Sequence, residues 1–203
     1  MNRRTLIKNT ILGAAAGLAF PQVAFTKTPK QPEGPFYPVV DQIDKDADLI
    51  RVEGREQIAK GEIVIVKGVV TDQSHQVVQN ARVEIWQACE SGKYDHPSDP
   101  NPAKLDPDFQ YWGIANSNDK GEYMFRTIIP GAYPAGQGWI RPPHIHFKIS
   151  ALGYEELITQ MYFSNQALNS KDLILQKLKK SDQEKVTIHF QKQDNFPHPV
   201  GQF

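Results

Sequence analysis

Short apolar segments rich in β-branched residues alternate along this chain with clusters of Gly, Pro, Asn and Asp. This alternation constrains the fold more than any other feature. Segments of this kind span residues 61–70, 81–86, 123–129, 144–150, 157–163 and 186–191. Their lengths, and the turn residues that bound them, are typical of β-strands. Only residues 170–180, where leucines recur among lysines, indicate a helix. The pattern predicts an all-β fold, a single-domain antiparallel β-sandwich with one short C-terminal helix.

Two long stretches without strand character separate these segments. Residues 89–112 and 130–143 are rich in Pro and Gly and are expected to form long loops. By contrast, residues 61–70 and 81–86 flank a short polar turn at 71–76, and residues 81–86 alternate apolar and polar side chains. We therefore expect these two segments to form an antiparallel hairpin with one face in water.

The first residues of the chain have the pattern of an export signal. A paired arginine in Asn2-Arg-Arg-Thr-Leu-Ile-Lys8 precedes an apolar run, Ile11 to Phe20, that is too short to span a bilayer. The pair resembles a twin-arginine signal, which directs folded proteins across the bacterial inner membrane. The alternative is a basic N-terminus without export. We expect residues 1–27 to be a removable signal and residues 28–203 to form the domain. The protein would then reach the periplasm without a stable membrane anchor.

Composition narrows the functional classes. Lys and Arg total 23, as do Asp and Glu, so the formal net charge is zero. No basic run interleaved with aromatic residues is present, and nucleic acid is therefore not an expected partner. Cys89 is the single cysteine, which excludes an internal disulfide. The domain must be stabilised by its core and by any metal that it binds.

The segment Arg141-Pro-Pro-His-Ile-His-Phe147 places two histidines two residues apart in an expected strand. Successive side chains of a strand point to opposite faces, so His144 and His146 share one face and Ile145 lies on the other. Two imidazoles on one face can bind a single metal ion. The alternative is that both histidines simply face solvent.

The remaining ligands of such a metal are not fixed by spacing. No Cys pair and no Asp or Glu at metal-ligand spacing flanks the histidines, so a structural zinc site has no obvious completion. A zinc or copper ion completed by water or a distant carboxylate stays open. Tyr94, in the Pro-rich loop, and Tyr133, just before the histidine segment, are further candidates. Tyrosines in such loops are more often packing residues than ligands.

Four motifs follow one another along the chain. They are Glu33-Gly-Pro-Phe-Tyr-Pro38, Val83-Glu-Ile-Trp-Gln-Ala88 with Gly92-Lys-Tyr-Asp-His96, Phe125-Arg-Thr-Ile-Ile-Pro-Gly-Ala-Tyr-Pro134, and Arg141-Pro-Pro-His-Ile-His-Phe147. In this order they resemble the intradiol ring-cleavage dioxygenases, and most closely the protocatechuate 3,4-dioxygenase branch. The likeness runs from about residue 33 to residue 163, most of the expected domain. Four motifs in order are far more specific than any one of them.

The resemblance implies a non-haem ferric ion held by Tyr94, Tyr133, His144 and His146. Fe(III) is a hard ion that prefers anionic oxygen ligands, and imidazole also suits iron. A phenol ionises near pH 10, but a trivalent cation can lower that pKa, as metals do for bound water and thiols. Two phenolates and one hydroxide then cancel the three charges of the ion, so the neutral centre can be partly buried.

The implied reaction is cleavage of a catechol by O2 between its two hydroxyl-bearing carbons, which gives a muconate-type diacid. In the family the tyrosine at the position of Tyr133 leaves the metal and can accept a substrate proton, whereas the one at Tyr94 stays bound. Arg141 is implied to stabilise charge on the substrate ring, a role suited to a fixed guanidinium. Gln160 is a further candidate for the pocket, and Tyr37 either lies near the entrance or only packs.

Several questions stay open after the resemblance. Ala135 stands where protocatechuate enzymes often carry an aromatic residue, so the ring substituent of the substrate is undetermined. The chain lacks the long N-terminal helical region of catechol 1,2-dioxygenases. Family members commonly assemble as homo- or hetero-oligomers. The alternative function is a catalytically silent β-sandwich binding module, because fold does not dictate function.

Overall fold

The structure, a computed structural model, describes residues 27–42, 44–136 and 138–203. The expected export signal therefore lies outside the described residues, apart from Lys27. The strands are β1 Ile63–Val69, β2 Arg82–Trp86, β3 Trp112–Asn116, β4 Glu122–Ile128, β5 Tyr133–Gly136, β6 Trp139–Arg141, β7 His144–Ser150, β8 Leu157–Phe163, β9 Thr187–Ile188 and β10 Val200–Gln202. The helical elements are two 3-10 helices, η1 Ala167–Lys171 and η2 Leu175–Lys177, and the α-helix α1 Lys180–Val186.

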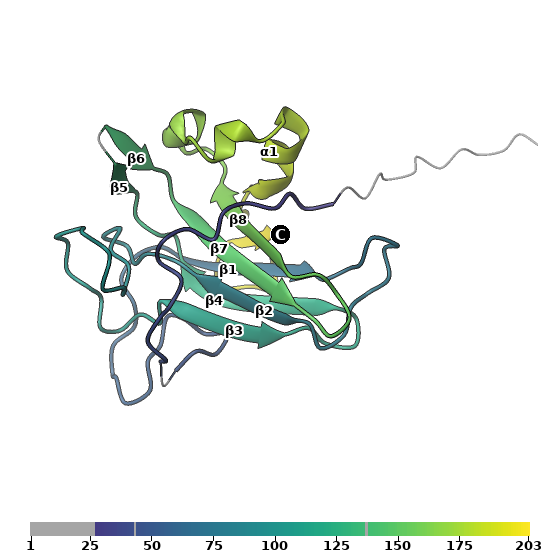
Figure 1. The fold of residues 1–203 in the computed structure, drawn as a ribbon. Coiled ribbons are helices and arrows are strands. Elements are labelled where there is room, and N and C mark those ends of the chain that lie inside the picture. Colours follow the sequence, from purple (N-terminus) through teal and green to yellow (C-terminus); the bar gives the residue numbers. More distant parts are fainter. Residues whose placement is uncertain (1–26, 43, 137) are drawn as a thin grey trace, which may run out of the picture.

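The strands form two packed sheets (Figure 1). One sheet has the order β10-β1-β4, and the other has the order β3-β2-β7-β8-β9. Neighbouring strands are antiparallel except for β1 with β10 and β8 with β9, which are parallel pairs at the sheet edges. β5 and β6 pair separately as a hairpin. The expected all-β sandwich is confirmed, with a mixed rather than a purely antiparallel pairing.

The core lies between the two sheets because each inner face carries apolar side chains at alternate positions. Val64 of β1 shares one fully buried cluster with Ile145 and Phe147 of β7. Since strand side chains alternate, His144 and His146 project from the opposite, outer face of the five-stranded sheet. Their burial has to come from other parts of the chain.

The segment before β1, residues 27–38, covers this outer face and is called the lead-in below. Figure 1 shows it in purple, running across β7 and β8. Gln31 donates from its backbone N–H to the carbonyl oxygen of Ile158 at 2.9 Å and from its side chain to the carbonyl oxygen of Gln160 at 2.8 Å. The Gln160 amide donates in turn to the carbonyl oxygen of Pro32 at 2.7 Å. These bonds fix the lead-in to β8.

The expected hairpin between residues 61–70 and 81–86 is wrong. β1 lies beside β4 and β10 in one sheet, whereas β2 lies between β3 and β7 in the other. The two segments stay together only through the bridge between Thr71 and Val77 and then separate. A polar turn can join neighbours in one sheet or pass between two sheets. The pairings of β1 with β4 and of β2 with β7, which are distant in sequence, decide the outcome.

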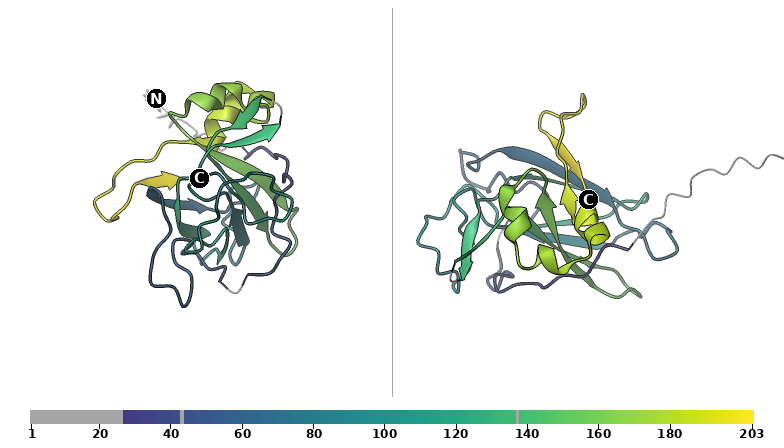
Figure 2. Two further views of the ribbon diagram at one scale, coloured as in Figure 1. Left: turned by 90° about the vertical axis from the view of Figure 1, so that its left-hand side faces the viewer. Right: turned by 90° about the horizontal axis from the view of Figure 1, so that it is seen from above.

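The helical region also differs from the expectation. Residues 170–180 contain part of η1 and all of η2, and α1 begins only at Lys180. Asp172 interrupts a continuous helix, because its buried side chain accepts hydrogen bonds from the backbone N–H groups of Ile174 and Leu175. Figure 2 shows these elements beside the β5–β6 hairpin. Within residues 27–42, 44–136 and 138–203, no helix is long and apolar enough to cross a bilayer.

Short strands account for the other differences. β5 and β6 lie within the stretch 130–143, which the sequence predicts to be a loop. β9 covers only two residues of the strand expected at 186–191. Pro134 lies within β5, where a two-stranded hairpin has an open edge that tolerates the missing N–H. The hairpin carries two of the predicted site residues, Tyr133 and Arg141, opposite each other.

Candidate metal centre

The floor of the site is a grid of side chains on the outer face of the five-stranded sheet. His146 of β7 lies opposite Trp86 of β2 and Gln160 of β8, and His144 lies opposite Tyr162 of β8. The Trp86 and His146 rings stack with centroids 4.8 Å apart and an interplanar angle of 14°. The centroids of the two imidazoles are 4.9 Å apart. Strand register and stacking therefore fix both histidines.

Two tyrosines reach this floor from outside the sheet. Tyr94 belongs to the loop between β2 and β3, and Tyr133 opens β5. The two phenol rings are 5.3 Å apart between centroids. The Tyr94 ring lies 6.3 Å from that of His146, and the Tyr133 ring lies 5.6 Å from that of His144. All four residues are at most 4% exposed. The structure thus brings together the four residues that the resemblance implies as ligands.

Two glycines permit the close approach of the tyrosine segments. A Cβ on Gly92 would lie 2.4 Å from the carbonyl oxygen of Ala132, and a Cβ on Gly131 would lie 2.3 Å from the carbonyl oxygen of Glu90. Both distances are well below van der Waals contact, so a larger residue would push the segments apart. Gly92 also has a φ of 79°, which glycine adopts at little cost. Backbone packing therefore sets the spacing of the two phenols.

The lead-in forms the roof of the site. The Phe36 ring lies 4.8 Å from that of Tyr94 and 6.1 Å from that of Tyr133, between centroids. Gly34, with a φ of 80°, lies so near His146 that a Cβ there would be 3.2 Å from the imidazole Cε1. Phe36 and Gly34 both belong to the motif Glu33-Gly-Pro-Phe-Tyr-Pro38. In the fold it shields the rings from water.

Arg141, at the end of β6, lies in the same cluster and is 3% exposed. Its Nη1 lies 2.8 Å from Nε2 of His144, and its Nη2 donates to Oε1 of Gln160 at 2.8 Å. Nδ1 of His144 lies 2.7 Å from the carbonyl oxygen of Pro142. A carbonyl only accepts and a guanidinium only donates, so His144 carries its proton on Nδ1 and a lone pair on Nε2. That lone pair points at the cluster and is available to a cation that displaces Nη1.

Burial keeps the four rings neutral. Desolvation first, and then the positive charge of Arg141, hold the pKa values of His144 and His146 well below the usual 6.5. Burial, and next the adjacent Tyr133, raise the pKa of Tyr94 well above 10. Burial also raises the pKa of Tyr133, although the charge of Arg141 opposes the change. Each ring is thus held in its uncharged form at neutral pH, and only a strong positive charge would ionise the phenols.

The donor set fits a ferric ion. Nδ1 of His146 is buried without a hydrogen-bond partner, which is costly for a group that binds nothing. The Tyr94 hydroxyl is also buried, beside the Tyr133 phenol. Two phenols and two imidazoles match the oxygen and nitrogen ligands that Fe(III) accepts. Across residues 27–42, 44–136 and 138–203, no group of three or more His, Cys, Asp and Glu side chains could hold a metal. A zinc or copper site completed by a carboxylate therefore finds no support in these residues.

Gln160 and Tyr37 take different places. Gln160 is fully buried and links Arg141 to the lead-in, so it lies within the cluster. The Tyr37 hydroxyl donates to a carboxylate oxygen of Glu84 at 3.1 Å, and its ring packs edge-on against Trp86 at 5.0 Å. Of the two places considered for Tyr37, the structure shows packing behind Trp86.

Two further polar residues, Tyr162 and Asp172, belong to the cluster but lie outside the predicted set. The Tyr162 hydroxyl lies 3.0 Å from Nη2 of Arg141, and Oδ2 of Asp172 lies 2.9 Å from its Nε. Tyr162 follows Gln160 by two residues on one strand, so alternation alone could have placed both on the same face. Asp172 stands in an irregular segment, where no periodicity indicates its direction.

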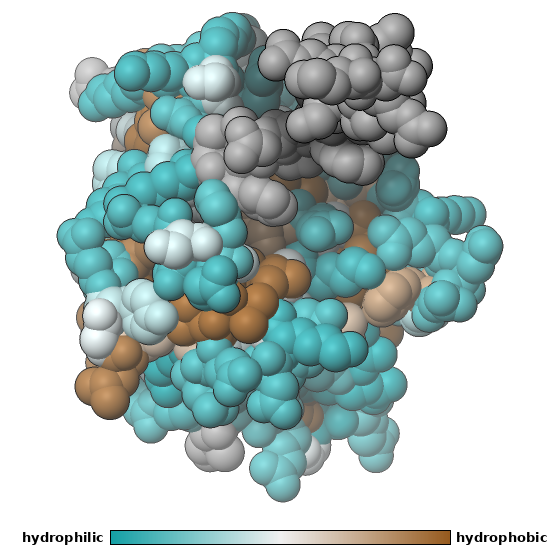
Figure 3. All heavy atoms as spheres, turned by 90° about the vertical axis from the view of Figure 1, so that its right-hand side faces the viewer, coloured by the Kyte–Doolittle hydropathy of each residue, from teal (hydrophilic) through white to brown (hydrophobic). Residues whose placement is uncertain are grey.

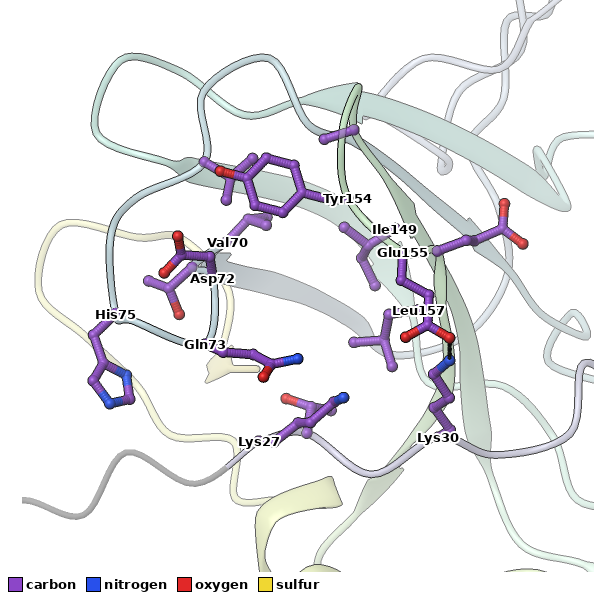
Figure 4. A pocket seen from close by; sticks show the side chains of 15 residues that line it. Lys27, Lys30, Val70, Asp72, Gln73, His75, Ile149, Tyr154, Glu155 and Leu157 are labelled. Atoms are coloured by element: carbon purple, nitrogen blue, oxygen red, sulfur yellow. Dashed lines mark hydrogen bonds and ion pairs between the residues drawn. The ribbon is translucent and has the colours of Figure 1, made fainter.

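A separate groove lies at the far end of β7 and β8. It has a volume of about 480 Å³ and is lined by the start of the lead-in, the connection between β1 and β2, and the β7–β8 turn. Figure 4 shows Lys30 and Glu155 joined by an ion pair at this groove, with Ile149 and Leu157 on its floor. Figure 3 looks onto this end of the molecule, where apolar atoms are surrounded by hydrophilic ones. None of the predicted site residues lines the groove.

Comparison with known proteins is consistent with the geometry. The family model Dioxygenase_C, described as a dioxygenase, matches residues 32–198. The chain is 34% identical over 174 residues to the protocatechuate 3,4-dioxygenase beta chain of Burkholderia cepacia, which covers 84% of this chain and 74% of that protein. It is 30% identical over 143 residues to a catechol 1,2-dioxygenase of Candida albicans, covering 64% of this chain but only 44% of that protein.

Solved structures share the fold. An intradiol ring-cleavage dioxygenase from Tetranychus urticae superimposes with a TM-score of 0.67 at 24% identity, covering 88% of this chain and 92% of that chain. The 3-chlorocatechol 1,2-dioxygenase of Rhodococcus opacus gives a TM-score of 0.66 at 22% identity, covering 86% of this chain and 70% of that chain. At these identities the likeness shows a common architecture.

Proposed function

Because the chain belongs to the Dioxygenase_C family, the intradiol ring-cleavage dioxygenases, we propose that it cleaves a catechol-type ring between its two hydroxyl-bearing carbons. O2 is the oxidant and a muconate-type diacid the product. One observation carries this proposal: the rings of Tyr94, Tyr133, His144 and His146 meet in one buried cluster. A silent binding module has no need for two buried phenols beside two buried imidazoles. That alternative is not favoured.

The cofactor we propose is a non-haem ferric ion held by these four side chains. Two features support this assignment: Nδ1 of His146 is buried without a hydrogen-bond partner, and the Tyr94 hydroxyl is buried beside the Tyr133 phenol. When bound, ferric iron would make a chelated catecholate susceptible to direct attack by O2, so that no external reductant is required. The chain has to supply binding, orientation, a dry surrounding and a destination for protons.

The described side chains suit these tasks. Tyr133 has a pKa raised by burial, and its hydroxyl oxygen can hold a proton taken from the substrate when it is released from the metal. Arg141 is a fixed cation in the same cluster, suited to stabilise negative charge that develops on the ring. Phe36 and Gly34 cover the rings from the solvent side. Tyr94 is the phenol that stays in place.

The relatives indicate a catechol-type substrate but differ in the ring substituent. The relatives are named for protocatechuate, catechol, hydroxyquinol and chlorocatechol. In this chain the β5–β6 hairpin carries the small, exposed Ala135, with Trp139 5.6 Å from the Arg141 guanidinium. We propose that this hairpin selects the ring substituent, because it brings Tyr133 and Arg141 to the cluster.

Colour and oxygen uptake test the proposal. The purified chain, loaded with iron, should show the red-brown absorption of a tyrosinate–iron(III) pair, and a catechol should shift that band. An oxygen electrode with protocatechuate, catechol, hydroxyquinol and chlorocatechol should show one mole of O2 consumed per mole of ring cleaved. A chain that stays colourless after iron loading and consumes no O2 with any of them would support the binding module instead.

We also propose that residues 1–27 direct export by the twin-arginine route, and that the chain works in an oligomer. The arginine pair at Arg3 and Arg4 motivates the first proposal, and the relation to a beta chain of a protocatechuate dioxygenase motivates the second. Replacing both arginines by lysine should leave the protein in the cytoplasmic fraction. The molar mass from light scattering on the purified, iron-loaded protein, without any second chain, would show whether it forms a homo-oligomer.

A further inference from the structure

A buried ion pair joins Arg141 to Asp172, a residue outside the predicted set, and so connects the site to the helical segment. Asp172 is fully buried and Arg141 is 3% exposed. Nε of Arg141 donates to Oδ2 of Asp172 at 2.9 Å, and Nη2 lies 3.4 Å from Oδ1. The carboxylate belongs to the irregular segment between η1 and η2, not to the sheet.

The hydrogen bonds of Arg141 divide its guanidinium into two sides. Nε and Nη2 are taken up by Asp172, by Oε1 of Gln160 at 2.8 Å and by the Tyr162 hydroxyl at 3.0 Å. Nη1 alone faces the rings, where it lies 2.8 Å from Nε2 of His144. A guanidinium is a rigid planar fork, so fixing two of its nitrogens also fixes the direction of the third.

Asp172 is itself held in place. Its Oδ1 accepts hydrogen bonds from the backbone N–H groups of Leu175 at 2.8 Å and Ile174 at 3.1 Å. The Tyr162 hydroxyl lies 3.3 Å from the same oxygen. The anchor of Arg141 is thus a rigid carboxylate in a turn, and no solvent-exposed side chain takes part in it.

Charge gives the pair a second role. A buried cation without a partner is strongly unfavourable, and Arg141 is 3% exposed. The Asp172 carboxylate, with Oδ2 2.9 Å from Nε of Arg141, supplies the opposite charge for a guanidinium that does not deprotonate in proteins. Without the carboxylate, an uncompensated positive charge would stand 2.8 Å from a ring nitrogen proposed to bind a metal cation.

We propose that Asp172 is a positioning residue of the site. Acting through Arg141, it aims Nη1 at the reacting ring and cancels the charge that would otherwise oppose a metal cation beside His144. This inference rests on the proposed function, since it concerns the same iron and the same substrate. It adds a residue from a different part of the fold, and it predicts that residues 141 and 172 act as one unit.

The test is a double-mutant cycle with Asp172→Asn and Arg141→Met. Asn keeps an oxygen that can accept from Ile174 and Leu175 but loses the charge. Asp172→Asn should weaken iron binding, measured by competition with a chelator in the absence of substrate, by about tenfold or more. It should lower turnover by about tenfold to a hundredfold. In the double variant both charges are absent, so iron affinity should return to within about threefold of the unmodified chain.

The matched control is Asp48→Asn. Asp48 pairs with Arg126 at 2.6 Å between Oδ1 and Nε, a carboxylate–guanidinium pair beside the three-stranded sheet, and its loss should leave iron affinity unchanged. The proposal is overturned if Asp172→Asn and Arg141→Met lower turnover multiplicatively, or if the double variant does not recover iron affinity. If the unmodified chain binds no iron, the proposed function fails first. If it binds iron without turnover, the affinity cycle still decides the role of Asp172.

Discussion

The two ends of strand β7, which pairs with β8 along its length, differ sharply in how deeply their side chains are buried. At its start, His144 and His146 are 2% exposed and lie among tyrosines and a paired arginine. At its end, Ile149 and the β7–β8 turn line an open groove together with Tyr154, which is 51% exposed. The groove is a hollow of about 480 Å³, and its Lys30–Glu155 ion pair lies at the surface.

None of the predicted site residues lines the groove, so an open hollow does not by itself locate the candidate site. Chemistry needs polar groups held without water, and each such group has to be fixed by several partners. At the start of β7 those partners come from β2, β8, the β5–β6 hairpin and the lead-in. At the far end, short exposed turns supply no comparable network among the described residues. The following experiments compare the two ends.

The largest effect is expected from His146→Ala. Removing one imidazole should abolish most iron binding and lower turnover by at least about a hundredfold, because the remaining donors no longer surround the ion. Iron content by atomic absorption and oxygen uptake would measure this. His189→Ala is the matched control, since His189 is exposed and bonds only to Ser164 among the contacts described. Equal iron content in both variants would contradict the assignment.

Acid should destabilise the iron-free protein through the same end of the strand. Burial, and then Arg141, depress the folded-state pKa of His144 and His146, so the unfolded chain takes up protons that the folded chain refuses. The stability that these neutral rings confer is fully present above pH 6.5 and is lost as pH falls below it. Each ring should contribute a slope of up to about 1.4 kcal/mol per pH unit. Urea unfolding between pH 7 and pH 5 would measure it.

His146→Asn provides the comparison for that slope. One titrating ring then remains, so the loss of stability between pH 6.5 and pH 5 should be clearly shallower than in the unmodified chain. Identical slopes would show that the buried histidines do not govern the acid response.

Tyr133→Phe should have a smaller effect than loss of a histidine. Tyr94 and both imidazoles remain, so some iron should stay bound, while the visible spectrum changes and turnover falls by about tenfold to a hundredfold. Tyr123→Phe is the control, because Tyr123 is a buried tyrosine of β4 in the other sheet. If both variants kept the same spectrum, Tyr133 would not be a ligand.

The smallest effect is expected at the groove. Tyr154→Ser should change the free energy of unfolding by no more than about 0.5 kcal/mol, because the side chain is half exposed. Iron content and turnover should stay the same. A loss of activity here would show that the two ends of β7 are coupled.

Much of the fold followed from local patterns. The strand segments near β1, β2, β4, β7 and β8 are apolar and β-branched, and the structure confirms them within one or two residues at most ends. The hairpin between β1 and β2 was wrong because sheet membership depends on partners far away in sequence. The helix position was wrong because one buried carboxylate, Asp172, competes for backbone N–H groups.

The histidines and the tyrosines among the candidate ligands were predicted on different grounds. Alternation placed His144 and His146 on one face by geometry that any strand obeys, and the structure confirms that shared face. Tyr94 and Tyr133 were implied only by the family resemblance, because a tyrosine in a loop has no fixed direction. Gly92 and Gly131 bring their two segments together through contacts that no local pattern specifies.

By itself, the sequence determined the class of fold, the shared face of the two histidines and the family to which the chain belongs. The tertiary structure alone decided that this outer face is roofed by Phe36, that Trp86 stacks on His146, and that Arg141 is held by Asp172. The physical reason is the separation in sequence between the residues that interact. Side-chain alternation is a property of neighbouring residues, whereas burial and hydrogen bonding depend on which distant segments meet.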